Sequence, residues 1–197
     1  MRVIAGTARS MPLRTVKGLD TRPTTDKTKE TLFNILQPDI PGCRFLDLFS
    51  GSGAIAIEAL SRGAAHAVLV EQNPKACTCI LENLRFTKLI DRAELQKCSV
   101  QSALQRMEGQ KPFGIIFMDP PYEQGLERQV LEYLAHSTLA DADTVIVTEA
   151  SLRTSFEYLE ELGFRAYKYK KYKTSQHVFI IKVPDDGYVD CMPATRS

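Results

Sequence analysis

Four consecutive residues, Asp119, Pro120, Pro121 and Tyr122, place a carboxylate, two prolines and an aromatic ring directly after an apolar run. Pro120 biases Asp119 toward an extended backbone, and neither proline has an N–H group to donate. The corner is therefore rigid and rich in hydrogen-bond acceptors. The same residues also suit an ordinary turn, so their chemistry depends on what the rest of the chain places beside them.

Acceptors next to an aromatic ring suit the methylation of an amino group on a nucleobase. Such an amine is a poor nucleophile because its lone pair is delocalised into the ring. Transfer needs the nitrogen held in line with the methyl donor while acceptors bind its hydrogens. The Asp119 carboxylate and the Pro120 carbonyl supply two acceptors, and Tyr122 can stack on the base, a contact worth about 1–3 kcal/mol. We therefore predict a catalytic role for residues 119–122.

A second motif, "DLFSGSGAIAIEAL", begins at Asp47 and has the form of a ligand-binding turn between a strand and a helix. Gly51 and Gly53 allow a close backbone approach to a ligand, and the following helix offers free N–H groups. Glu71 ends the next apolar run, at about the 20-residue distance where a carboxylate binds ribose hydroxyls in nucleoside-binding folds. The motif has neither the third glycine of a dinucleotide site nor the lysine of a P-loop. It favours a nucleoside without a pyrophosphate, and S-adenosylmethionine is such a cofactor.

The predicted cofactor contacts come from this motif, from the next strand end and from the catalytic corner. The Asp47 carboxylate or the backbone near it would face the methionine amine, and Glu71 would bind the ribose. The alternative for Asp47 is a plain role in the turn at the strand end. The set predicted on these grounds is Asp47, Phe49, Gly51, Gly53, Glu71, Gln72 and Asp119.

The elements that must position these residues alternate along the chain. Strands are expected over 44–49, 66–71, 93–98, 113–119 and 144–149, and helices near 54–62, 74–87, 100–108, 126–137 and 152–162. This alternation predicts an α/β fold with an open, mostly parallel, doubly wound sheet. Two final runs, 164–174 and 176–183, predict an antiparallel hairpin at the sheet edge. Both motifs then lie beyond the carboxyl ends of the strands, where the strand order reverses.

The two ends of the chain differ from this central part. Residues 1–23 are basic and turn-rich, and we expect a small N-terminal β-hairpin extension there. Residues 184–197 are polar and are expected to form a loose C-terminal tail. The main domain is therefore expected over residues 24–183.

The composition limits the classes of function. The chain has 197 residues and a net charge of +1, so any contact with nucleic acid must come from local basic clusters. No apolar run reaches membrane-spanning length and the start of the chain lacks the apolar core of a secretory signal, so we expect a cytoplasmic protein with no membrane partner. The five cysteines are odd in number and none form a C-x2-C pair, so no metal is expected.

Three segments, "RVIAGTARSMPLRTVKGLDTRPTTDKTKETLFNIL", "LDLFSGSGAIAIEALSRGA" and "DPPY", resemble the RsmD-type family of bacterial 16S ribosomal RNA guanine-N(2) methyltransferases. The likeness covers residues 2–183 in the same order. It implies a Rossmann-like class I methyltransferase domain with a seven-stranded sheet, and methyl transfer from S-adenosylmethionine to the exocyclic amine of a guanine. The implied partner is the ribosomal RNA of an assembling small subunit. A monomer is favoured, and the oligomeric state stays open.

The resemblance also implies further cofactor contacts. Arg22 and Thr24 would lie near the methionine end of S-adenosylmethionine. Many such enzymes have an acid after the third strand to meet the adenine amine, whereas this chain has Ser99 at that place. The adenine would therefore be recognised by backbone groups of Cys98, Ser99 and Val100.

Two basic segments are candidates for RNA binding. The first carries Arg2, Arg9 and Arg14, which precede the catalytic fold. The second, "YKYKKYK", interleaves tyrosines with lysines that include Lys168, Lys170 and Lys171. Rings between ammonium groups suit an RNA surface, but an edge strand with a solvated lysine face explains the second segment equally well.

Four other functions remain as alternatives. A DNA adenine-N(6) methyltransferase shares the "DPPY" corner but usually needs a large recognition insertion, for which the chain has no room. A protein-glutamine methyltransferase more often has asparagine before the prolines. A nicotinamide-dependent oxidoreductase would need the third glycine. A non-catalytic RNA-binding assembly factor would have no need for an intact glycine loop and corner.

Overall fold

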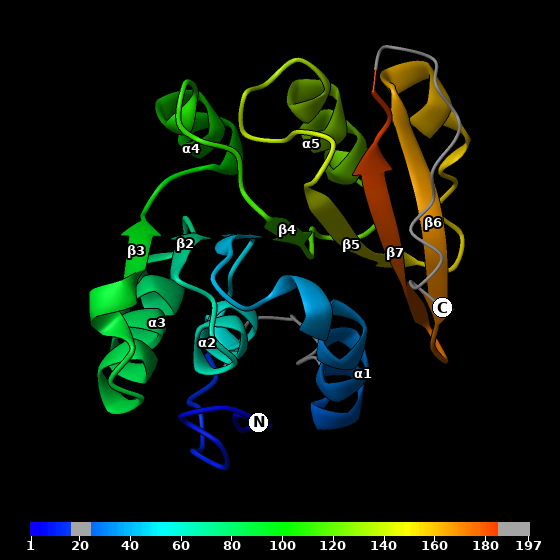
Figure 1. The fold of residues 1–197 in the computed structure, drawn as a ribbon. Coiled ribbons are helices and arrows are strands. Elements are labelled where there is room, and N and C mark those ends of the chain that lie inside the picture. The colour runs from blue at the N-terminus through cyan, green and yellow to red at the C-terminus, as the bar shows by residue number, and fades with distance from the viewer. Residues whose placement is uncertain (17–24, 185–197) are drawn as a thin grey trace.

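The computed structural model describes residues 1–16 and 25–184. In these residues a seven-stranded sheet has the order β3-β2-β1-β4-β5-β7-β6 (Figure 1). Its strands are β1 (Arg44–Leu48), β2 (His66–Val70), β3 (Ala93–Gln96), β4 (Ile115–Met118), β5 (Val145–Ser151), β6 (Phe164–Lys171) and β7 (Ser175–Lys182). Strands β1 to β5 pair in parallel, and β7 is antiparallel to both β5 and β6. The predicted sheet with its antiparallel C-terminal hairpin is confirmed.

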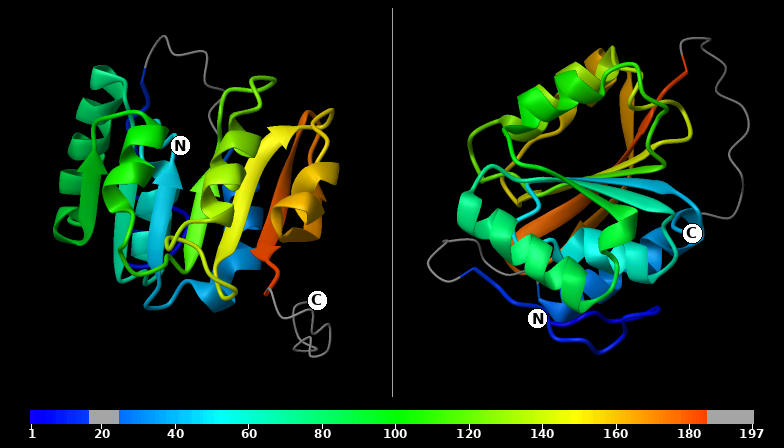
Figure 2. Two further views of the ribbon diagram at one scale, coloured as in Figure 1. Left: turned by 90° about the horizontal axis from the view of Figure 1, so that it is seen from above. Right: turned by 90° about the vertical axis from the view of Figure 1, so that its left-hand side faces the viewer.

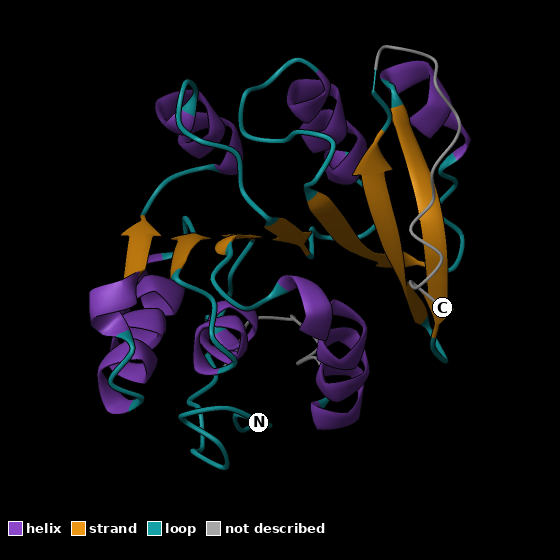
Figure 3. Ribbon diagram, viewed as in Figure 1, coloured by secondary structure: helices purple, strands orange, loops and turns teal. Residues whose placement is uncertain are grey.

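Helices cover both faces of this sheet (Figures 2 and 3). One face carries α1 (Asp26–Leu36), α2 (Ala54–Ser61) and α3 (Pro74–Phe86), and the other carries α4 (Val100–Met107) and α5 (Leu126–Ala135). Three short 3-10 helices complete the described elements: η1 (Gln37–Asp39), η2 (Ile90–Arg92) and η3 (Glu157–Leu162). Within the described residues, no helix has the length and apolar character needed to cross a bilayer.

The alternation of side chains along the strands builds two cores, one on each face of the sheet. In β4, Ile115 and Phe117 join the core under α1 to α3, whereas Ile116 and Met118 join the core under α4 and α5. Successive side chains of a strand point to opposite faces, so a strand covered on both faces is apolar throughout. The central strands are therefore covered on both faces up to their carboxyl ends, and the corner at residues 119–122 follows β4 directly.

The helix predicted over 152–162 is shorter than expected. Strand β5 continues to Ser151, and only the 3-10 helix η3 follows, ended by Gly163 at φ 74°. Phe156 and Leu159 are the buried apolar side chains here, and their three-residue spacing fits a 3-10 turn, in which residues i and i+3 eclipse.

Residues 1–16 form a compact antiparallel loop with a single β-bridge, which follows the course of the expected hairpin but contains no extended strand. Arg2 and Pro12 make an isolated antiparallel bridge, flanked by backbone hydrogen bonds from the Val3 N–H to the Met11 carbonyl and from the Leu13 N–H to the Met1 carbonyl. Pro12 has no N–H for a longer ladder. The loop instead packs on the outer side of α2, as Figures 1 and 2 show.

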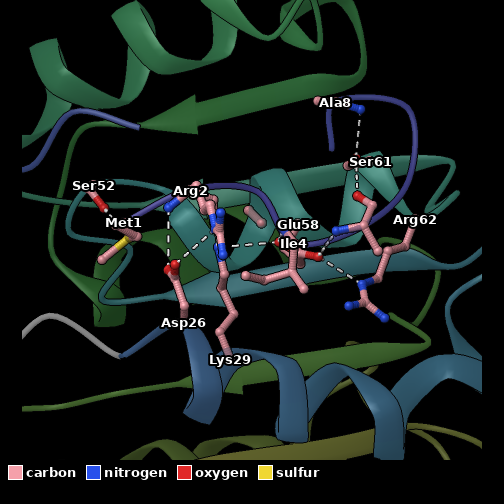
Figure 4. A network of polar contacts seen from close by, with 12 residues as sticks. Met1, Arg2, Ile4, Ala8, Asp26, Lys29, Ser52, Glu58, Ser61 and Arg62 are labelled. Carbon is pink, nitrogen blue, oxygen red and sulfur yellow. Dashed lines mark hydrogen bonds and ion pairs between the residues drawn. The ribbon is translucent and has the colours of Figure 1, made fainter. Parts of the chain in front are cut away.

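A buried carboxylate, that of Glu58 on α2, fixes this loop in place (Figure 4). It accepts hydrogen bonds from the N–H groups of Ile4 at 2.8 Å and Ala5 at 3.0 Å. It also lies 3.2 Å from Nζ of Lys29 and 2.8 Å from Nε of Arg62, and neither Lys29 nor Glu58 has solvent-exposed side-chain area. The pKa of Lys29 is lowered, because burial lowers it more than the nearby Glu58 charge raises it. The first residues of the chain are thus bound to the helix that follows the glycine motif.

Candidate active site

A cavity of about 820 Å³ opens above the carboxyl ends of the central strands, between α4 and α5. The glycine motif, the end of β2, the start of α4 and the corner after β4 all contribute to its wall. The residues predicted from the sequence that line it are Phe49, Gly51, Glu71, Gln72, Cys98, Ser99, Val100, Asp119, Pro120, Pro121 and Tyr122. Two motifs separated by about 70 residues of chain thus face one space, as expected at a switch point of strand order.

The glycine motif turns sharply between β1 and α2. Gly51 and Gly53 have φ angles of 56° and 77°, and Phe49 has a φ of 64° without being glycine. A side chain on Gly53 would meet Leu69 at 3.1 Å, so this glycine lets α2 pack closely rather than lining the cavity. Positive φ at a phenylalanine is strained and is often associated with ligand sites. The loop therefore presents the Phe49 ring and the Gly51 backbone to the cavity.

Glu71 joins this loop to the end of β2. Its Oε2 accepts from the N–H of Gly51 at 2.9 Å, and its Oε1 accepts from the N–H of Asn73 at 2.8 Å. Each carboxylate oxygen still has a lone pair for a ligand, because an ionised carboxylate offers about four acceptor sites. The side chain is thus held at the cavity wall in the position where ribose hydroxyls were expected.

Asp47 takes a different place from the one predicted for its carboxylate. It is 1% exposed, does not line the cavity, and accepts from the N–H of Ala56 at 3.2 Å at the start of α2. Burial raises the pKa of Asp47 to about 8, with the Ala56 hydrogen bond acting against this and the Glu71 charge adding to it. The side chain organises the turn, which is the plainer of the two roles weighed for it. Arg22 and Thr24 lie outside the described residues.

Ser99 stands at the place after β3 where the resemblance to the family leads one to expect an acid. Its Oγ accepts from the N–H of Ser102 at 3.3 Å and caps α4, so the serine hydroxyl serves the helix. Ser99 is in extended backbone, and Cys98 and Val100 flank it on the cavity wall. This part of the cavity wall therefore offers backbone groups to a ligand.

The corner after β4 carries a concentrated set of acidic groups. Asp119 has its pKa raised well above the ordinary value, first by burial and then by the charges of Glu149 and Asp47. Tyr122 is 43% exposed, and its hydroxyl donates to Oε1 of Glu149 at 3.1 Å. Burial, with the charges of Glu149 and Asp119, also raises the pKa of Tyr122. Three carboxylates, those of Glu71, Asp119 and Glu149, therefore line one cavity, which suits a ligand with positive charge.

Glu149 is the site residue that sequence reasoning missed. Burial acts to raise its pKa, but hydrogen bonds from His177, Ser175 and Tyr122, and the His177 charge, lower it overall. The Oε2 atom lies 3.1 Å from Nε2 of His177, which is fully buried. One signal was available in the sequence, because Glu149 ends the expected strand 144–149 just as Glu71 ends the expected strand 66–71.

The sheet order together with this cavity defines a class I methyltransferase. Residues 1–181 match the family model described as "Conserved hypothetical protein 95". The ribosomal RNA small subunit methyltransferase D of Escherichia coli is 35% identical over 154 residues, which cover 77% of this chain and 75% of that protein. The protein of the same name from Haemophilus influenzae is 33% identical over 150 residues, covering 76% and 78%. A solved structure of the yhhF protein of Escherichia coli superposes with a TM-score of 0.82 at 30% identity, covering 93% of this chain and 98% of that one. This chain belongs to the RsmD family of ribosomal RNA small subunit methyltransferases.

Proposed function

We propose that this protein transfers the methyl group of S-adenosylmethionine to the exocyclic N2 amine of a guanine in small-subunit ribosomal RNA. The observation that carries the proposal is the single cavity shared by the glycine motif, Glu71 and the Asp119 to Tyr122 corner. The names of the relatives, which describe small-subunit ribosomal RNA methyltransferases, support the substrate.

Some residues around the cavity would bind the cofactor, and others would bind the target base. Glu71 would hold the ribose and the backbone at residues 98–100 the adenine, while Phe49 and Gly51 would enclose the cofactor beside the strand ends. S-adenosylmethionine supplies an electrophilic methyl group. A sulfonium cation suits the three carboxylates of the wall, since a nearby positive charge favours their ionised forms.

The corner would hold the target amine. Asp119 and the Pro120 carbonyl accept its two hydrogens, which orients the nitrogen lone pair toward the methyl group. Tyr122, with its hydroxyl anchored on Glu149, would present its ring for stacking. The proton leaves to water or to Asp119 once the methyl group is largely transferred.

Two basic surfaces would bind the RNA. Arg2 and Arg14 form ion pairs with Asp26 and Glu82, but the arginine side chains are 63% and 74% exposed, so these pairs compete weakly with phosphate. Arg9 is exposed in the same N-terminal loop. In this proposal residues 1–23 serve as an RNA-contacting extension of the methyltransferase domain, 24–183, and the tail, 184–197, has no assigned role.

The lysines of β6 would form the second surface. Lys170 pairs in register with His177, and His177 pairs with Glu149 across the next strand. Two strand spacings of about 4.8 Å therefore separate the Lys170 backbone from that of Glu149. Lys171 is exposed like Lys170, whereas Lys168 is half-buried. The register favours a role for these lysines beside the catalytic corner over that of a merely solvated edge.

The experiment is a transfer assay with labelled S-adenosylmethionine and partly assembled small subunits lacking the modification. We expect label in the small-subunit RNA and N2-methylguanosine after digestion to nucleosides. N6-methyladenosine instead would favour the adenine-N(6) alternative, and no label in any RNA would contradict the proposal. Naked RNA and mature subunits, tested in parallel, would show whether an assembly intermediate in the cytoplasm is the substrate. Sedimentation of the free protein would test the monomer.

A further inference from the structure

A chain of four polar side chains runs from the catalytic corner to the tip of the β6–β7 hairpin. The Tyr122 hydroxyl donates to Glu149 Oε1 at 3.1 Å, and Glu149 Oε2 lies 3.1 Å from His177 Nε2. On the other side of the ring, His177 Nδ1 lies 3.1 Å from the Tyr172 hydroxyl. The chain thus joins the loop after β4 to β5, to β7 and to the residue that follows β6.

The two middle residues of this hydrogen-bond chain, Glu149 and His177, are buried in the sheet, where apolar side chains could also pack. Glu149 is 8% exposed and His177 is not exposed at all. The two residues are direct partners in the antiparallel register of β5 and β7. On β7, Val178 and Phe179 after His177 are buried and apolar, whereas Ser175 and Gln176 before it are buried and polar. A buried ion pair is weak support for stability, because well-packed apolar residues often replace one at no loss.

The two ends of this hydrogen-bond chain, Tyr122 and Tyr172, indicate what the buried Glu149–His177 pair can do. Tyr122 lines the cavity with 43% of its surface exposed, and its hydroxyl donates to Glu149 and also has a hydrogen bond with the Ser175 side chain. A ring anchored at its hydroxyl end keeps one orientation before a base arrives, so less side-chain entropy is lost on stacking. His177 in turn holds the Glu149 carboxylate, and Tyr172 and the edge of Phe117 fix the His177 ring.

We infer that Glu149 and His177 are positioning residues, which act through the Tyr122 hydroxyl to hold the Tyr122 ring in the orientation that receives the target base. The inference rests on the proposed function for its kinetic consequence, but the hydrogen-bond chain itself needs neither cofactor nor RNA. Tyr172 is the outer support of the chain, next to the lysines of the hairpin.

A double-mutant cycle tests the kinetic consequence. Tyr122→Phe keeps the ring and removes the hydroxyl, and Glu149→Met keeps the approximate size and removes the acceptor. Each change should lower kcat for RNA methylation by about tenfold, as expected for a hydrogen bond to a charged group, with KM for RNA little changed. Because both remove the same contact, the double variant should be no slower than the slower single variant. Glu149→Gln, which keeps an acceptor oxygen, should recover most of the rate.

The controls separate positioning from a general loss of structure. Glu161→Gln changes an exposed glutamate on η3 and should leave the rate as in the wild type. Cofactor affinity, measured by calorimetry, should stay unchanged in the Tyr122 and Glu149 variants. Multiplicative losses in the double variant would overturn the inference, because Glu149 would then act by a route other than the Tyr122 hydroxyl.

A second measurement holds even if the RNA substrate is wrong or Glu149→Met does not fold. The chain has seven tyrosines, so protein labelled with 13C at the tyrosine ζ carbon gives few signals, and Tyr122→Phe identifies that of Tyr122. We expect this signal to shift in Glu149→Gln and in His177→Gln, and to stay in place in Glu161→Gln. A Tyr122 signal that does not move in Glu149→Gln would overturn the inference. An absence of RNA methylation by the wild type, with the expected shifts present, would contradict the proposed function alone.

Discussion

Asp119 is the residue whose chemistry matters most to the proposed reaction. It follows β4 in the cavity wall, and its pKa is raised by burial and by the Glu149 and Asp47 charges. Two roles fit this position. The carboxylate either orients the target amine by accepting a hydrogen bond, or it removes a proton as an obligatory base.

Substitution at Asp119 distinguishes these roles. Asp119→Asn keeps an acceptor oxygen and should retain measurable transfer, whereas Asp119→Ala should lose more, by about a further tenfold for one hydrogen bond in a buried site. We favour orientation, because the amine becomes strongly acidic only once methyl transfer is advanced. Single-turnover rates at saturating RNA and cofactor would measure the difference. Equal, near-complete loss in both variants with binding intact would instead make Asp119 an obligatory base.

The raised pKa of Asp119 also predicts a proton release on cofactor binding. The free protein keeps a proton on Asp119 to a higher pH than an ordinary aspartate does, and a bound sulfonium cation lowers that pKa again. Affinity for S-adenosylmethionine should therefore rise as the pH rises through the Asp119 pKa of the free protein, and should level off above it. Calorimetry in buffers of different ionisation enthalpy would count the released protons. S-adenosylhomocysteine, whose sulfur is neutral, should release fewer, and an equal release for both ligands would count against this assignment.

At the scale of elements, α2 connects the site to the N-terminal loop. Its first turn receives the Asp47 carboxylate through the Ala56 N–H, and its fifth residue, Glu58, binds the loop and the cations of Lys29 and Arg62. The α3 residue Asn83 adds a bridge, because its Nδ2 donates at 3.0 Å both to the Arg14 carbonyl and to the Ser52 carbonyl of the glycine motif. The loop is therefore a structural part of the domain, and its core residues Val3, Ala8 and Leu13 pack with α1 to α3.

Loss of the Glu58 carboxylate should destabilise this part of the fold strongly. Glu58→Ala leaves Lys29 buried without its carboxylate and two backbone N–H groups without an acceptor, and should lower the free energy of unfolding by about 3–5 kcal/mol. Urea denaturation followed by circular dichroism would measure the change. The matched control is Glu82→Ala, which removes an exposed partner of Arg14 and should change stability by less than about 1 kcal/mol. Similar small changes for both variants would show that the network contributes little.

At the scale of the whole molecule, a net charge of +1 leaves RNA binding to the two local surfaces. Replacing Lys170 and Lys171 by Ala should reduce the slope of log K against log salt by about 0.7 per lost phosphate contact on single-stranded RNA, and by about 0.9 on a duplex. Replacing Arg2, Arg9 and Arg14 together should reduce the slope in the same way. Filter binding over a salt series would measure both sets. A slope that stays the same in one set, with the protein folded, would show that those residues make no phosphate contact.

The sequence by itself determined most of what is local in this protein. The alternation of strands and helices, the glycine turn after β1, Glu71 at the end of β2 and the corner after β4 all follow from residue types and spacings within short segments. The topology rule for parallel sheets then places these strand ends at one edge. For this reason the sheet agrees with the prediction, and eleven of the predicted site residues line one cavity.

Tertiary structure alone decided the contacts that join distant segments. Glu149 and His177 meet because β5 and β7 pair in one particular register across 28 positions, and Glu58 meets Ile4 across 54. Asp47 looked like a ligand contact, but the start of α2 folds back onto its carboxylate and buries it. A pattern along the chain specifies periodicity and turn chemistry, whereas these contacts depend on how strands and helices pack, and each buried charge takes the partner that packing brings within reach.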